Sequence, residues 1–123
     1  MRVGIAALIA LGLGTTADAY VSSEGHWYDL SCNASGYVLT SRAPVGRWFG
    51  EGAFTTVTED RETIYLGRSC DAARTGWTGG TWCWANGGIS LGFNEYGIGF
   101  PRQELVCPQG SGGLDLLDLQ CGC

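Results

Sequence analysis

Apolar and polar residues alternate in short runs over most of the chain that follows its first twenty residues. The clearest runs are residues 81–85 and 89–93, which flank Asn86-Gly87, and residues 96–100, which follow a short turn. Asn-Gly between two alternating segments favours a tight hairpin, because both residues tolerate positive φ. We therefore predict a three-stranded antiparallel meander with Ile89 and its alternate neighbours on one face.

Other segments combine β-branched and aromatic residues with bounding turn residues, which is typical of strands. These candidate strands are residues 27–32, 36–41, 54–58, 63–67 and 103–107. The pieces at 43–44, 50–52 and 59–61 have the composition of turns or loops. No long segment has helical periodicity. We therefore predict an all-β fold with seven or eight strands, a small antiparallel β-barrel stabilised by disulfides, with a sandwich as the alternative.

The N-terminus has a different pattern. Arg2 precedes an apolar run at residues 3–14, and Ala17-Asp18-Ala19 supplies the small-x-small pattern that signal peptidase requires. The apolar run is shorter than the ~20 residues that span a bilayer. We expect a signal peptide at residues 1–19, a mature chain that begins at Tyr20, and export to a periplasm or to the extracellular space without a membrane anchor.

The chain after residue 107 leaves the strand pattern. Residues 108–113 have the composition of a flexible linker, and a leucine-rich piece then leads to Cys121-Gly122-Cys123. The leucines suit either a last strand or one helical turn. We predict one barrel domain at 20–107, followed by a linker and a cysteine-containing tail at 108–123.

All six cysteines follow the expected cleavage site: Cys32, Cys70, Cys83, Cys107, Cys121 and Cys123. An even number in an exported chain predicts disulfides rather than metal ligands or nucleophiles. The cysteine spacing alone leaves the pairing open. The net charge of −5 disfavours nucleic acid as a partner. This charge either attracts a basic protein partner or serves only to keep the protein soluble.

Residues for catalysis are scarce. His26 is the only histidine and has no nucleophile motif near it. The terminal cysteines lack the C-x-x-C spacing of structural zinc sites. Glu59, Asp60 and Glu62 surround Arg61 in an expected turn, where acidic side chains are usually solvated. We therefore expect a non-enzymatic protein without catalytic residues, cofactor or metal.

The tryptophans allow two interpretations. Trp82 and Trp84 share one face of a predicted strand, and Trp77 lies in a glycine-flanked segment before it. If this face points inward, the rings belong to the core, which is the favoured interpretation. If it points outward, Trp77, Trp82 and Trp84 form an aromatic platform suited to sugar rings. Trp77 is expected to be the most exposed of the three.

Four features of the strand order resemble one family. A cysteine ends the first strand before 36–39, the strand at 64–66 precedes a polar loop, Trp84 leads into the turn at 85–87, and Cys107 closes the last strand. This organisation is similar to the small periplasmic inhibitors of c-type lysozyme. The resemblance implies an eight-stranded antiparallel barrel.

The resemblance also implies contact residues. The family's inhibitory loop is matched best by residues 71–74, although Asp71 stands where the family has a serine, and Asn86 stands where it has a lysine. We therefore expect a partner to be contacted through the segment 69–80 and the Asn86 turn. The candidate contact residues are Ser69, Asp71, Arg74, Trp77 and Asn86.

The same comparison suggests disulfides. A barrel of this kind implies Cys32–Cys107 across the first and last strands and a local Cys70–Cys83 bridge. Cys121 and Cys123 then remain, and because a bridge between them would be strained, one of them is an alternative partner in the other pairs.

Together these features favour an exported, monomeric, non-enzymatic binding protein whose partner is a basic protein such as a lysozyme. The alternatives are a glycan-binding or cell-wall-binding module that uses Trp77, Trp82 and Trp84, and a secreted structural protein.

Overall fold

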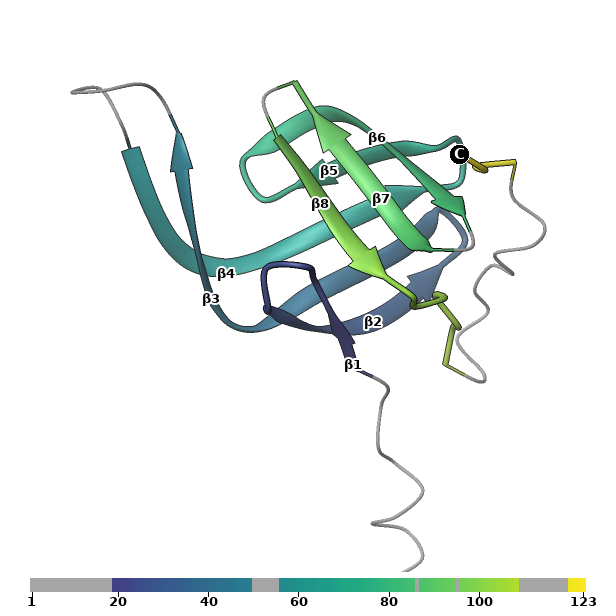
Figure 1. Ribbon diagram of the computed structural model, residues 1–123, viewed down its shortest axis with the longest axis horizontal. Coiled ribbons are helices and arrows are strands. Elements are labelled where there is room, and N and C mark those ends of the chain that lie inside the picture. The colour runs from purple at the N-terminus through teal and green to yellow at the C-terminus, as the bar shows by residue number, and fades with distance from the viewer. Residues whose placement is uncertain (1–18, 50–55, 86, 95, 109–119) are drawn as a thin grey trace, which may run out of the picture.

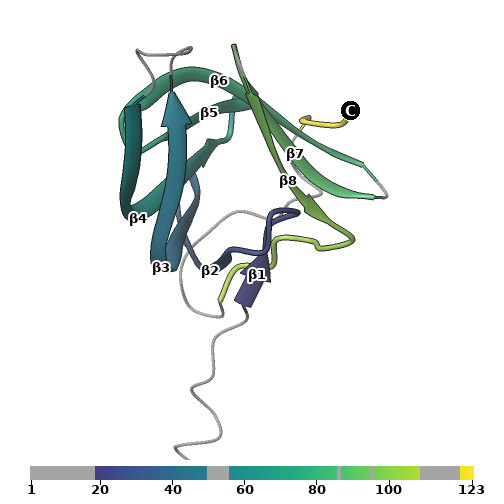
Figure 2. The ribbon, with the colours of Figure 1, turned by 60° about the vertical axis from the view of Figure 1, so that its left-hand side comes forward.

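The computed structural model describes residues 19–49, 56–85, 87–94, 96–108 and 120–123 (Figure 1). In these residues, eight antiparallel strands follow one another in chain order and curl into a nearly closed barrel (Figure 2). The strands are β1 (Ala19–Val21), β2 (Trp27–Asn33), β3 (Gly36–Phe49), β4 (Thr56–Gly67), β5 (Asp71–Arg74), β6 (Trp77–Ala85), β7 (Gly88–Phe93) and β8 (Tyr96–Pro101). The predicted all-β antiparallel barrel is confirmed. The expected signal peptide falls almost wholly outside the described residues and stays a prediction.

The meander predicted from the Asn-Gly turn is present as β6, β7 and β8. Trp84 pairs with Ile89, and β7 pairs along its full length with β8. Ile89, Leu91 and Phe93 are all buried. The two-residue alternation therefore predicted their common face correctly, and this face points into the core.

The predictions for β3 and β4 were wrong in extent. Ala43-Pro44 and the segment 59–61 were expected to be turns, but they lie inside β3 and β4. The segments 54–58 and 63–67 were expected to be two strands, but their described residues belong to the single strand β4. Pairing of the two strands shifts register between Thr40 and Pro44. Proline is tolerated at such an irregularity, because no ladder hydrogen bond is required from its nitrogen.

The expected strand at 103–107 is absent, because these residues close the barrel through side chains instead of a backbone ladder. The Gln103 amide accepts a hydrogen bond from Val21 N at 2.8 Å and donates to Val21 O at 2.7 Å. Ser23 N donates to Gly99 O at 2.8 Å, and Val106 N donates to the Tyr20 hydroxyl at 3.0 Å. The seam between the first and last strands is therefore held partly by one side-chain amide.

The core fills the barrel with residues from every strand. Tyr28 meets Phe100 edge to face at 5.3 Å between ring centroids, and Tyr37 meets Trp82 in the same way at 6.0 Å. Trp82 is 2 % exposed. The inward interpretation of the Trp82 face is therefore correct, and the three tryptophans do not form one exposed platform.

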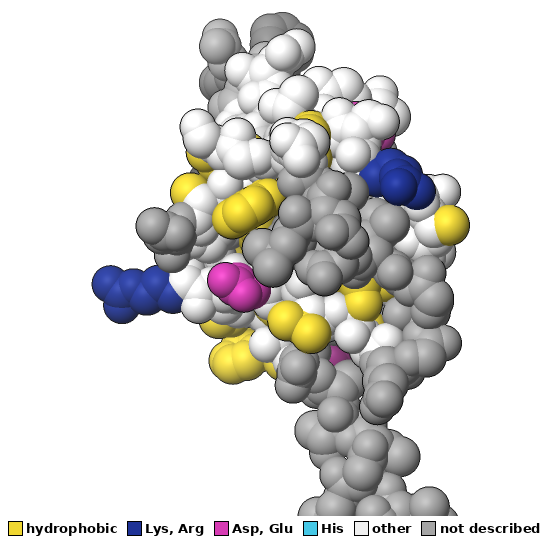
Figure 3. Space-filling model, turned by 90° about the vertical axis from the view of Figure 1, so that its right-hand side faces the viewer, with side chains coloured by type: hydrophobic (Ala, Val, Ile, Leu, Met, Phe, Trp, Pro, Cys, Tyr) yellow, Lys and Arg dark blue, Asp and Glu magenta, His cyan; other side chains and the backbone are white. Residues whose placement is uncertain are grey.

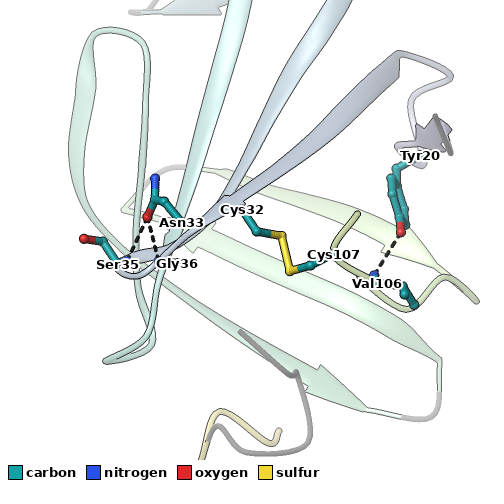
Figure 4. The surroundings of a disulfide bond; sticks show 7 residues. All are labelled: Tyr20, Cys32, Asn33, Ser35, Gly36, Val106 and Cys107. Carbon is teal, nitrogen blue, oxygen red and sulfur yellow. Dashed lines mark hydrogen bonds between the residues drawn. A yellow bond between two sulfur atoms is a disulfide. The ribbon is translucent and has the colours of Figure 1, made fainter. Parts of the chain in front are cut away.

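Three disulfides cross-link the barrel, and they pair Cys32 with Cys107, Cys70 with Cys121 and Cys83 with Cys123. The expected Cys32–Cys107 bridge is confirmed (Figure 4). The expected Cys70–Cys83 bridge is wrong, since each of these cysteines takes one terminal cysteine.

The reason lies at the edge of β6. The pairing of β5 with β6 reaches only to Thr81, so the rest of this β6 edge is open to another segment. Trp84 N donates to Cys121 O at 2.7 Å, and Cys123 N donates to Trp84 O at 2.9 Å. The C-terminal residues thus dock on the part of the β6 edge that β5, which begins at Asp71, does not reach, beside Cys70 and Cys83.

Consecutive antiparallel strands place alternate turns at opposite ends of the barrel. We call the end that carries the turns after β2, β4 and β6 the cystine end, because all three disulfides lie there. We call the other end the charged end. Figure 3 faces the cystine end, where the visible hydrophobic side chains form small separate groups. At the opposite end, β3 and β4 extend beyond the other strands (Figure 1).

Candidate functional site

A buried ionic cluster lies inside the charged end of the barrel, with Glu62 of β4 at its centre. Glu62 Oε2 accepts from Arg47 Nε at 2.9 Å, and Glu62 Oε1 accepts from Arg47 Nη2 at 2.8 Å. The Tyr28 hydroxyl donates to Glu62 Oε1 at 2.7 Å, and Arg74 Nη1 lies 3.5 Å from Glu62 Oε2. Strands β2, β3, β4 and β5 therefore meet at one carboxylate.

The position of Glu62 follows from strand alternation. Glu62, Ile64 and Leu66 are alternate residues of β4, and all three are buried. The expectation that Glu62 is solvated in a turn was therefore wrong. Glu59, Asp60 and Arg61 of the same segment are exposed, in agreement with that expectation.

The environment of Glu62 favours its charged form. Burial by itself raises the pKa of a carboxyl group, but hydrogen bonds from Arg47 and Tyr28 and the charges of both arginines outweigh burial and lower the pKa of Glu62 below its ordinary value. A general acid needs a raised pKa to hold its proton near neutral pH. Glu62 therefore has the character of a structural counter-ion.

The pKa values of two partners of Glu62, Arg47 and Tyr28, are both raised. Burial lowers the pKa of Arg47, but its bonds to Glu62 and Glu24 dominate and raise that pKa further. Burial and the hydrogen bond to Glu62 raise the pKa of Tyr28, so its phenol stays protonated. Glu24 contributes a second carboxylate, with Oε1 2.6 Å from Arg47 Nη1. The lowered pKa of Glu62 and the raised pKa of Arg47 therefore keep this pair charged near neutral pH.

An aromatic wall stands beside the cluster. The Arg74 guanidinium lies over the Trp77 ring at 5.7 Å and over the Tyr96 ring at 5.5 Å, and Arg74 Nε donates to the Tyr96 hydroxyl. The Tyr96 ring stacks on Phe93 at 5.3 Å. Burial raises the pKa of Tyr96, although Arg74 opposes this effect.

Trp77 lies within this wall. Its ring meets Tyr96 edge to face at 5.8 Å and Phe93 at 6.5 Å, and it is only partly exposed. Among the tryptophans whose side chains are described, the most exposed is Trp27, at 52 %.

A cavity of about 340 Å³ opens above the cluster. Its lining is Val45, Arg47, Asp60, Arg61, Glu62, Arg74, Thr75, Gly76 and Trp77. This volume lies in the range of small-ligand and side-chain pockets. The floor is charged but internally paired, one wall is aromatic, and the rim carries exposed charges. Such an arrangement suits reversible binding of a polar group.

The four predicted contact residues that the structure describes do not come together at one site. Segment 69–80 forms the β5–β6 hairpin, which runs between the two ends of the barrel. Arg74 and Trp77 lie at the charged end beside the cavity, and Arg74 is buried. Ser69 and Asp71 are exposed at the cystine end. Asn86 lies outside the described residues, so its predicted contact role stays a prediction.

Sequence reasoning did not identify the cluster as a unit. Arg47, Glu62 and Arg74 come from three strands, and only the pairing of those strands brings them together. The available signal was a charged residue at an inward position of the alternation, as at Glu62. That signal was hidden by the expectation of a turn at 59–61.

In the described part of the chain, no group of three or more His, Cys, Asp or Glu side chains is arranged to hold a metal ion. Within the same residues there is no helix with the length and apolarity of a membrane span. Comparison with protein-family models, with curated proteins and with solved structures found no match.

Proposed function

We propose that this protein is an exported, monomeric, non-enzymatic binding protein whose charged end receives a basic protein, with a c-type lysozyme as the first candidate. The proposal rests on the cavity at this end, where a paired ionic floor and an aromatic wall lie beneath exposed charges. The three disulfides fit an oxidising, exported environment.

A pre-organised surface favours binding, because little conformational entropy is then lost on association. Arg47 is held by Glu62 and Glu24, and Arg74 is held by Glu62 and Tyr96. The walls of the cavity are thus fixed before a partner arrives. Disulfides at the cystine end restrain the opposite side of the same barrel.

Charge supports a basic partner at long range. The positive charges at the cavity (Arg47, Arg61 and Arg74) are matched by Asp60, Glu62 and the nearby Glu24. The long-range electrostatic attraction of a basic partner therefore comes from the net charge of −5 of the whole chain. At short range, exposed Asp60 and half-exposed Glu24 are the carboxylates that a lysine or arginine of the partner can reach.

The test measures binding and inhibition of a purified c-type lysozyme by the oxidised mature protein. We expect a saturable one-to-one complex whose association rate falls with added salt. Asp60→Asn removes one rim carboxylate and is expected to weaken binding about 3–10-fold. Glu104→Gln makes the same charge change at an exposed site in the seam segment and is the matched control.

A third variant, Asp71→Asn, tests the cystine end. If Asp71→Asn weakens the complex and Asp60→Asn does not, the partner docks at the end that the family resemblance indicated, and the charged-end proposal is wrong. Absence of saturable binding to lysozyme and to a panel of other basic proteins would overturn the proposal as a whole.

A further inference from the structure

A second hollow lies on the outer surface of the barrel, apart from the cavity at the charged end. It has a volume of about 430 Å³ and is lined by Gly25, His26, Trp27, Arg42, Ala43 and Pro44. None of these residues lines the first cavity. The two hollows are therefore separate candidate sites.

Trp27 gives this hollow an aromatic face. It begins β2, where Tyr28 and Leu30 point into the core, so alternation directs Trp27 outward. Half of its surface is accessible. The other large hydrophobic residues that are exposed in the described chain, Tyr65 and Val106, do not line this hollow. The site therefore offers one aromatic ring rather than a broad apolar patch.

Polar groups beside Trp27 are held in place and retain hydrogen-bonding capacity. Arg42 donates to Asp29 Oδ1 from Nε at 2.9 Å and from Nη2 at 2.7 Å. Within the described residues, Asp29 Oδ2 and Arg42 Nη1 have no hydrogen-bond partner. Both side chains are about half exposed, at 48 % and 47 %. Arg42 lines the hollow and can offer its Nη1 donor to a ligand there, and Asp29, which holds Arg42, lies on the same face of β2 as Trp27.

The chemistry of these groups selects a neutral, polyhydroxylated ring. The charges of Arg42 and Asp29 cancel, so the site does not favour a strongly charged ligand. One face of a pyranose ring presents C–H groups, which pack on an indole, and its edge presents hydroxyls, which pair with carboxylate and guanidinium groups. The volume of the hollow suits a ligand of one or two sugar rings.

We propose that Trp27, with the Arg42–Asp29 pair, forms a glycan-binding subsite for a neutral oligosaccharide. This subsite shares no lining residue with the cavity of the proposed protein-binding site, although its β1–β2 turn residues lie at the same end of the barrel. It also differs from a platform built on Trp77, Trp82 and Trp84, because Trp82 lies in the core.

The test titrates the ¹⁵N-labelled oxidised protein with cellotetraose, maltotetraose and N-acetylchitotetraose while the indole N–H signals are followed by NMR. The Trp27 signal is assigned by its loss in Trp27→Ala. We expect a saturable shift of this signal with at least one of these sugars, and affinity at least ~10-fold weaker in Trp27→Ala. Trp27→Phe, which keeps an aromatic face, is expected to retain part of the affinity.

Tyr65→Ala is the matched control, since Tyr65 is an exposed aromatic residue of similar accessibility on β4. It is expected to bind as the wild type does. No saturable shift with any of the three sugars, or equal affinity in Trp27→Ala and wild type, would overturn the proposal. Lysozyme binding by Trp27→Ala is measured in parallel and is expected to be unchanged, so failure of either proposal is visible separately.

Discussion

Arg47 and Glu62 form a two-pronged ion pair across β3 and β4, with N–O distances of 2.9 and 2.8 Å. Their side chains are only 7 % and 3 % exposed. Two parallel charge-assisted hydrogen bonds fix the geometry of both groups. Because Arg74 and Tyr28 contact the same carboxylate, the pair also joins two further strands. The floor of the cavity is therefore part of the framework that holds this end of the barrel.

Glu62→Gln tests this framework. The substitution leaves two buried guanidinium groups without their central carboxylate. Removal of one partner from a buried ion pair typically costs about 3–5 kcal/mol. We expect a loss of this size in the free energy of unfolding, measured by denaturant titration with the disulfides intact.

Glu59→Gln is the matched control, because Glu59 is exposed on the same strand. We expect a change within about 0.5 kcal/mol. Equal losses in Glu59→Gln and Glu62→Gln would mean that the cluster contributes little to stability.

The pH dependence of stability isolates the same carboxylate. The pKa of Glu62 in the folded protein lies below its ordinary value of 4.5. Above this ordinary value the contribution of Glu62 is fully present. As the pH falls below it, the unfolded chain takes up a proton first, and stability decreases until the folded-state pKa has been passed.

The measurement compares denaturant titrations of wild type and Glu62→Gln from neutral pH down into the acid range. The difference between the two proteins is expected to stay constant at neutral pH and to shrink below about pH 4. A difference that does not vary with pH would contradict the lowered pKa of Glu62.

The sequence predicted correctly those elements whose structure depends on neighbouring residues alone. The β6–β7 hairpin follows from Asn86-Gly87 and the alternation on either side, which need no information from distant residues. It was a poor guide at residues 43–44 and 59–61. There, turn-like composition coincides with one long strand pair whose outward positions are polar, and pairing with the partner strand overrides the local preference.

Distant pairings explain what was missed at the site. Arg47 meets Glu62 only because β3 and β4 pair in one particular register, which shifts between Thr40 and Pro44. The terminal cysteines reach Cys70 and Cys83 because the pairing of β5 with β6 stops at Thr81 and leaves the rest of that β6 edge open. Neither relationship is visible in residue spacing along the chain.

The barrel seam is tested at Gln103. Its amide satisfies both the N–H and the C=O of Val21, so Gln103→Ala leaves these two backbone groups without that partner. An unpaired buried polar group costs about 1–3 kcal/mol, and the part-exposed seam places the expected loss near the lower value. Denaturant titration measures the loss, and the amide of Val21 is expected to exchange hydrogen faster.

The exposed neighbour Glu104 supplies the control, since Glu104→Ala removes a side chain that does not take part in the seam bonds. We expect unchanged stability and unchanged exchange at Val21. If Gln103→Ala leaves hydrogen exchange at Val21 as slow as in the wild type, the amide does not close the seam.

The disulfide pairing is tested by tryptic digestion of the denatured, unreduced protein followed by mass spectrometry. Cleavage after Arg68, Arg74 and Arg102 places Cys70 and Cys83 on separate peptides and the last three cysteines together on peptide 103–123. Because the bridges join Cys32, Cys70 and Cys83 each to a cysteine of that peptide, all cysteine-containing peptides are expected in one covalent assembly. A Cys70–Cys83 bridge would instead release a separate pair of peptides and contradict the structure.

The stabilising effect of the tail is measured with the double variant Cys70→Ser/Cys121→Ser, which removes one bridge without leaving a free thiol. The bridge joins residues 51 positions apart. Restriction of a loop of this length in the unfolded chain corresponds to about 4 kcal/mol, so we expect a loss of this order in the free energy of unfolding. Cys83→Ser/Cys123→Ser removes the bridge that closes a similar loop of 40 positions, and we expect a similar loss in the free energy of unfolding.

Lysozyme binding by the two double variants tests whether the cystine end takes part in recognition. Since each tail bridge alone still anchors the end of the chain to β6 or its neighbour, neither variant is expected to alter lysozyme binding at the opposite end. Loss of that binding with stability retained would show that the cystine end takes part in recognition.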